Sequence, residues 1–156
     1  MNTIDTRETN QTKSMDAAAA PEQEFDAPAK VLDLVVEAMA ALGAEPDVAR
    51  DAARTGRILL GSQRLLLACA PDESALIVSA LLDENWAGSR ERRALLLKAN
   101  AHLLLTAGIS FALGMGGAQL LCRWNLDTHI THMPDALARW LRNFAALAAD
   151  LQAVPA

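Results

Sequence analysis

The chain has 156 residues, of which 52% are hydrophobic and 21% are charged, and its formal net charge is −5. This length is typical of one domain with a single core, and an acidic chain repels phosphate backbones, which argues against nucleic acid as a partner. The two cysteines, Cys69 and Cys122, form neither a CxxC pair nor a disulfide framework, which fits a reducing compartment.

Targeting and membrane signals are weak in this sequence. No apolar stretch reaches the roughly 18 residues of a membrane span, so we expect no membrane insertion. The N-terminal segment lacks a basic region followed by an apolar one, which makes the cytoplasm the default location.

Residues 1–24 are polar, contain no aromatic side chain and carry a net charge of −3, from five acidic and two basic residues. Such a segment buries too little apolar surface to offset its ordering entropy. The sequence therefore predicts a disordered tail over 1–24 and one folded domain over 25–156.

The folded part opens with a helix and three strands. Apolar residues at helical spacing predict a helix over 26–42, and 46–54 is either a further helical turn or a loop. Short strands are predicted over 57–60, 64–70 and 75–82. The turns between them have two to four residues, which indicates antiparallel hairpins.

These strands do not alternate polar and apolar residues. Leu65 and Leu67 point to one side, and the equally apolar Leu66 and Ala68 point to the other. An antiparallel sheet usually leaves one face in water and shows it by alternation. Here both faces of the predicted sheet need to be covered.

A second helix begins near Ser89, a good N-cap residue, and ends at Ala107-Gly108. Its apolar side chains spread over about 200° of the helix circumference, twice the width needed to pack on one sheet. These side chains are Leu96, Leu97, Leu103, Leu104 and Leu105, and they leave Lys98, His102 and Thr106 as a narrow polar stripe. We therefore expect this helix to contact two partners.

A hairpin and a last helix complete the chain. Strands over 109–113 and 118–124 flank the turn Gly114-Met115-Gly116-Gly117, and a helix is predicted over 134–152. The predicted order is α-β-β-β-α-β-β-α, which is an α+β fold with a twisted antiparallel sheet packed by helices.

Motifs for catalysis or metal binding are not convincing. The glycine-rich turn lacks the lysine, the hydroxyl residue and the following helix of a phosphate loop. The pair His129 and His132, with Asp127 nearby, is more typical of a solvated loop than of a metal site. Cys69 and Cys122 lie among leucines, where a buried structural thiol is expected. No cofactor is predicted.

Asn100 falls in the middle of the apolar arc of the second helix, where an unpaired amide would cost about 1–3 kcal/mol. Two explanations remain open. The amide either binds a strand-end or loop carbonyl of its own chain, or it forms a hydrogen bond across the two-fold axis of a dimer.

The stretch ERRALLLKANAHLLLTAGISFALGMGGAQLLCRW, followed by MPDALARWL, resembles the class I type III secretion chaperones, the family of the Tir chaperone. The likeness covers roughly residues 25–152. Its most specific parts are the charged helix start, the run Leu96-Leu97-Lys98-Ala99-Asn100, and the Thr-Ala-Gly exit into a glycine-containing hairpin.

The resemblance implies a homodimeric, ATP-independent chaperone of the bacterial cytoplasm and no enzyme activity. Such a chaperone binds the non-globular N-terminal segment of a secreted effector, keeps it soluble and delivers it to the export apparatus. The implied partners are therefore a second copy of the chain, the effector segment and the ATPase of the secretion system.

On this interpretation the excess apolar surface is shared between a dimer interface and a client surface. The expected dimer interface consists of Leu96, Asn100, Leu103, Leu104 and Phe111. The expected client surface consists of Leu32, Val35, Val36, Leu59, Leu65, Leu67 and Val78, some of which must belong to the core.

Two other functions compete with this one. The first is a peptide-binding regulatory or adaptor domain of the same fold that is not tied to secretion. The second is a small hydrolase or metal protein that uses Cys122, His129 and His132; the missing catalytic constellation argues against it.

Overall fold

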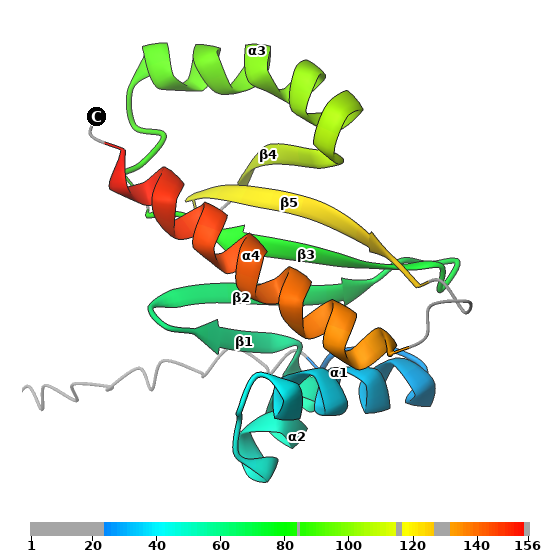
Figure 1. Cartoon of the computed structure of the whole chain (residues 1–156). Coiled ribbons are helices and arrows are strands. Elements are labelled where there is room, and N and C mark those ends of the chain that lie inside the picture. The colour runs from blue at the N-terminus through cyan, green and yellow to red at the C-terminus, as the bar shows by residue number, and fades with distance from the viewer. Residues whose placement is uncertain (1–23, 84, 115–116, 127–131, 155–156) are drawn as a thin grey trace, which may run out of the picture.

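The computed structural model describes residues 24–83, 85–114, 117–126 and 132–154. They form an α+β fold in which helices pack on a five-stranded antiparallel sheet (Figure 1). The predicted fold class is confirmed.

The sheet has the strand order β1-β2-β3-β5-β4, and all neighbouring strands are antiparallel. The strands match the predicted ranges closely, because glycine and the Pro71-Asp72 turn interrupt the apolar runs. Their bounds are β1 Arg57–Leu60, β2 Gln63–Cys69, β3 Ala75–Leu81, β4 Ile109–Gly114 and β5 Gly117–Asn125.

Three helices form the second layer: α1 (Ala29–Ala41), α2 (Pro46–Thr55) and α4 (Met133–Ala153). The stretch left open between a helical turn and a loop is α2, a helix of 10 residues. It begins with a proline, which loses no needed N–H there, and ends at Gly56 in the left-handed conformation. Its buried residues are alanines, and most of its other residues are polar, so the segment has few large apolar side chains that would predict a helix.

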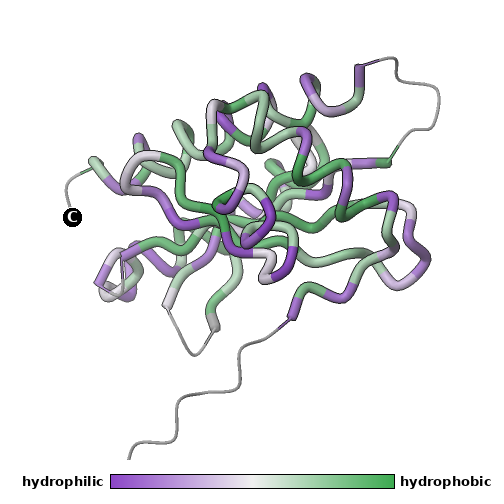
Figure 2. The backbone as a smooth tube through the Cα atoms, turned by 90° about the horizontal axis from the view of Figure 1, so that it is seen from below, coloured by the Kyte–Doolittle hydropathy of each residue, from purple (hydrophilic) through white to green (hydrophobic). Residues whose placement is uncertain are grey.

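The core lies between α1, α4 and one face of the sheet. α4 crosses that face diagonally, and α1 packs against both α2 and α4 (Figure 1). The largest fully buried side chains are Val31, Val35, Leu65, Leu76, Val78, Leu120, Leu137 and Leu141. In Figure 2 hydrophobic residues lie along the extended segments and recur along the helices, and polar residues lie at many of the turns.

The fourth helix, α3 (Arg90–Ala107), packs against β4 rather than on the face covered by α4, and its start lies near the end of α4 (Figure 1). Ser89 is its N-cap, as predicted, and the side-chain oxygen of Ser89 accepts a hydrogen bond from the backbone N–H of Arg92 at 3.1 Å. Gly108 ends the helix in the left-handed conformation. Among the side chains described in α3, Leu96 is the one that is buried.

In the part of the chain that the structure describes, every helix is too short or too polar to cross a bilayer.

Candidate binding surfaces

One face of the sheet is not covered by helices. Strand alternation places Leu65, Leu67 and Val78 on the helix-covered side and their neighbours on the opposite side, which we call the open face. The apolar side chains of the open face are exposed or half-buried, and they are Leu59, Leu66, Ala68, Ile77, Leu81 and Leu121. The expectation that apolar residues lie on both faces of the sheet is therefore confirmed, and the open face also carries Arg57, Arg64 and Arg123.

Two hollows lie along the open face. The first, of about 500 Å³, is lined by Leu66, Ile77 and Leu121 and by the segment around Phe25. The second, of about 480 Å³, lies at the β1 end and is lined by Leu59, Leu66 and Leu81 among others. Both hollows combine leucine side chains with polar ones. The polar residues include Glu24, Asp26, Arg57 and Ser79 in the first hollow and Arg57 and Arg64 in the second. An extended peptide could cover this surface.

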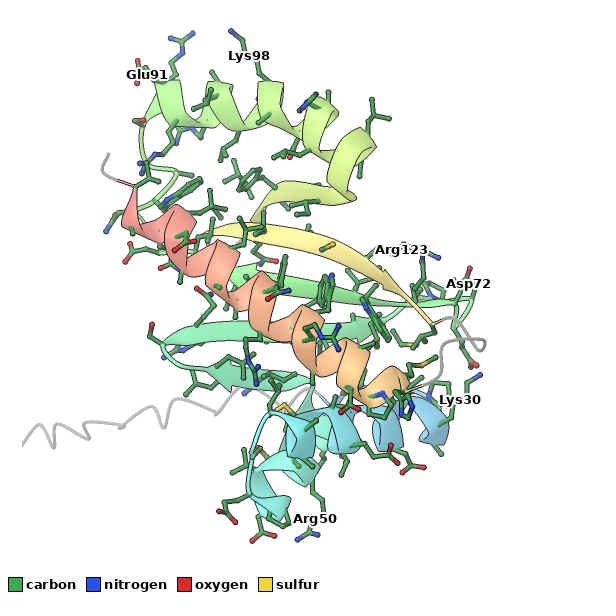
Figure 3. The ribbon with its side chains drawn as sticks, in the orientation of Figure 1. Lys30, Arg50, Asp72, Glu91, Lys98 and Arg123 are labelled. Carbon is green, nitrogen blue, oxygen red and sulfur yellow. The ribbon has the colours of Figure 1, made fainter. Side chains whose placement is uncertain are left out.

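The second apolar surface is on α3. Leu97, Leu104 and Leu105 fall within about 100° of the helix circumference. Their side chains are 72%, 59% and 87% exposed, so no other part of the described chain covers them. Lys98 and Glu91 point away from the rest of the molecule (Figure 3). α3 thus has one apolar side on β4 and a second apolar side without a contact among the described residues. The second partner that the wide arc predicts stays a prediction.

Asn100 fixes α3 to β4. Its Nδ2 donates to the carbonyl oxygen of Phe111 at 2.9 Å, and its Oδ1 accepts from the Phe111 N–H at 2.6 Å. The ladder with β5 leaves these two backbone groups pointing away from the sheet. The amide of Asn100 therefore binds the outer edge of β4, which is the internal partner of the two alternatives left open by the sequence.

A cluster around Trp86 holds the start of α3 against the end of α4. The Trp86 indole N–H donates to the Leu151 carbonyl at 2.8 Å, and the ring stacks on Phe111 with centroids 5.9 Å apart. The guanidinium of Arg92 lies 4.8 Å from the Trp86 ring centroid and donates to the carbonyls of Trp86 and Val154. These contacts set the position of α3 relative to the sheet.

The predicted client surface is only partly accessible. Val35, Leu65 and Val78 have no exposed surface, and Leu67 is buried, so all four belong to the core and the prediction is corrected for them. Leu65, Leu67 and Val78 face the helices, because the neighbouring residues of their strands lie on the open face, and Val35 belongs to the same core from α1. The remaining three positions can be reached from solvent: Leu32 and Val36 are half-buried on α1, and Leu59 on β1 is 64% exposed.

The predicted dimer residues also divide into two groups. Leu104 is exposed, and Leu103 and Phe111 are half-buried. Leu96 is buried in its own chain, and the amide of Asn100 is already bonded there. The prediction omitted the exposed Leu97, Leu105 and Leu113. The signal for Leu97 and Leu105 was available, since both lie in the apolar arc of the helix.

The described residues that were considered for catalysis or metal binding do not form a site. Burial raises the pKa of both Cys69 and Cys122, which disfavours the nucleophilic thiolate. Within the described residues, no group of three or more His, Cys, Asp or Glu side chains could hold a metal ion. His132 precedes α4, whereas His129 and Asp127 lie outside the described residues.

The acidic turn at Asp72 has a local role. The Ser74 hydroxyl donates to Asp72 at 2.6 Å and holds the pKa of the carboxyl below its usual value. Arg123 donates to the Ser74 hydroxyl from β5, and Figure 3 shows Arg123 beside this turn. This network stabilises the β2–β3 connection.

The fold is similar to one already solved. One match is to a chain of "Structure of the HopA1-SchA Chaperone-Effector Complex", with a TM-score of 0.57 and 17% identity, over 78% of this chain and 92% of that chain. No family model and no curated protein matches the sequence. At this identity the likeness establishes the shared fold.

Proposed function

We propose that this protein is an ATP-independent chaperone of the bacterial cytoplasm for a type III secreted effector. It binds the non-globular N-terminal segment of the effector, keeps that segment soluble and competent for export, and delivers it to the secretion apparatus and its ATPase. The observation that carries the proposal is apolar surface in excess of the core, exposed on two separate parts of a fold shared with a chain from a chaperone–effector complex. The resemblance of residues 25–152 to the class I secretion chaperones adds the type III assignment.

The exposed side of α3 is assigned to a homodimer interface. Large exposed apolar patches on a soluble protein are normally covered by a partner. Leu97, Leu104 and Leu105 form such a patch, and Leu113 on β4 is also exposed. A second copy that places its own α3 there would cover the patch by a self-complementary contact.

The open face is assigned to the client. An unfolded segment can lie along a sheet face and place alternate side chains in hollows, ordering only when it binds. Of the accessible positions in the prediction, Leu59 lies on the open face. Leu32 and Val36 lie on α1, outside that face, and are kept as a separate client contact. Leu66, Ile77 and Leu121 replace the four core residues, because they line the first hollow.

The alternative of a peptide-binding regulatory domain uses the same surfaces. It differs in the client, which would be a segment of a folded regulator rather than the N-terminus of a secreted protein.

The test is capture of clients by the full-length protein from lysate of its native host, followed by limited proteolysis of the complex and mass spectrometry. We expect protection confined to the N-terminal segment of a secreted protein. Protection of an internal or C-terminal segment in a protein that is not secreted would contradict the proposal and favour the regulatory alternative.

A further inference from the structure

The second hollow of the open face contains two arginines. Arg57 on β1 pairs with Leu66 on β2, so Arg57 and Arg64 occupy diagonal positions on the same face. Diagonal neighbours on an antiparallel pair are about 7–8 Å apart. Both arginines line the hollow, and no acidic residue does.

Neither guanidinium forms an ion pair with the part of the chain that the structure describes, although Arg57 also lines the first hollow, to which Glu24 and Asp26 belong. Arg57 and Arg64 are exposed, and their side chains make no ion pair or hydrogen bond with any described residue. By contrast, Arg50 and Arg54 on α2 each pair with an aspartate one turn away. The chain has a net charge of −5, so two arginines without an ion-pair partner in one hollow form a positive site on an acidic protein.

Aliphatic side chains surround the pair. Leu59 lies directly opposite Arg64 in the β1–β2 register, Leu66 lies opposite Arg57, and Leu81 lines the same hollow. Arginine binds carboxylates in a fork geometry and more strongly where water is partly excluded. Nucleic acid would also bind arginines, but the acidic chain and the leucine surroundings disfavour it.

We propose that this hollow selects the client by charge. It binds an extended stretch of the client's N-terminal segment in which an acidic residue and an aliphatic residue stand two positions apart, so that both side chains point to the same side. A carboxylate then lies between Arg57 and Arg64, and the aliphatic groups lie on the leucines. This inference rests on the proposed function and adds to it the chemistry of the bound segment.

The test measures binding of fluorescent twelve-residue peptides to the full-length protein by anisotropy. The three probes have the same leucine and valine residues, each two positions from a test residue, so that both kinds of side chain lie on one side of the extended peptide. The test residue is Glu, Gln or Lys. We expect the Glu peptide to bind about tenfold more tightly than the Gln peptide, as for hydrogen bonds to charged groups, and the Lys peptide to bind most weakly. Raising the salt concentration should narrow these differences.

Charge reversal supplies the decisive variant. Arg57→Glu/Arg64→Glu should prefer the Lys peptide over the Glu peptide. The matched control is Arg139→Glu/Arg142→Glu, which makes the same charge change at exposed positions of α4, on the other side of the sheet, and should keep the original order. Circular dichroism checks that each variant folds. If the charge-reversal variant unfolds, Arg57→Gln/Arg64→Gln takes its place. This neutral variant should bind the Glu and Gln peptides equally.

Equal binding of the three peptides, binding of none, or an unchanged Glu preference in the reversal variant would overturn the inference. A synthetic peptide of residues 1–23 serves as a competitor of the fluorescent Glu peptide. If it displaces that probe at a lower concentration than the unlabelled Glu peptide does, the hollow binds the chain's own N-terminal segment, and the inference is wrong. The proposed function is tested separately, by capture of clients from lysate and protection of their N-terminal segment from proteolysis. It can therefore hold when this inference fails.

Discussion

At the scale of single residues, burial separates side chains that look alike in the sequence. Val35 and Leu59 are both aliphatic positions of the predicted client surface, yet one has no exposed surface and the other is 64% exposed. The sequence cannot distinguish them, because the strand containing Leu59 is apolar on both sides. Which side is covered depends on where α1 and α4 pack.

This difference predicts opposite results for the same substitution. Val35→Asp places an unpaired carboxylate in the core and should destabilise the fold by about 4 kcal/mol or more. Leu59→Asp should change the free energy of unfolding by no more than about 0.5 kcal/mol and weaken client binding. Urea denaturation followed by circular dichroism measures both, and comparable destabilisation by the two substitutions would show that Leu59 belongs to the core.

The buried Cys122 thiol should make the free energy of unfolding depend on pH. Burial raises its pKa in the folded state above the ordinary value of 9.0, so the folded protein holds this proton more tightly than the unfolded chain. The resulting stability is fully present below pH 9.0 and is lost as the pH rises through the folded pKa. The sequence contains no tyrosine to mask this loss.

Urea unfolding of the wild type and of Cys122→Val between pH 7 and pH 11 tests the assignment. The wild type should lose stability more steeply above pH 9.0 than the variant does. Two parallel profiles would mean that this thiol is not the group responsible.

At the scale of elements, the sequence predicts the existence and approximate bounds of most helices and strands. Apolar spacing and turn residues act locally, so they are visible without the fold. The sequence does not decide between a helix and a loop for α2, because alanines such as Ala49 and Ala52 pack well but are only weakly apolar. The partner of Asn100 could not be chosen either, since Phe111 reaches it only after α3 has turned back onto β4.

The contact between α3 and β4 depends strongly on this asparagine. Asn100→Ala leaves the N–H and C=O of Phe111 without their partner, and we expect a loss of about 1–3 kcal/mol in the free energy of unfolding. Asn143→Ala, at an exposed position of α4, is the control and should cost less than about 0.5 kcal/mol. Urea denaturation at a fixed protein concentration measures both; an Asn100→Ala variant as stable as the control would contradict the structural role of this amide.

At the scale of the whole molecule, the chain divides its apolar residues among three surfaces. One is the core between the sheet, α1 and α4; the others are the open face and the outer side of α3. A chain that buried all its aliphatic groups would need a second layer over the open face. The described residues provide none, and we therefore propose that a second copy covers α3 and a client covers the open face.

This account depends most directly on the outer side of α3. Sedimentation equilibrium at micromolar concentration should give twice the chain mass of 16.7 kDa for the wild type. Leu97→Glu/Leu104→Glu should give the single-chain mass with an unchanged far-ultraviolet spectrum, and Val48→Glu, at an exposed position of α2, should leave the dimer intact. A folded wild-type protein that sediments at 16.7 kDa would contradict the account.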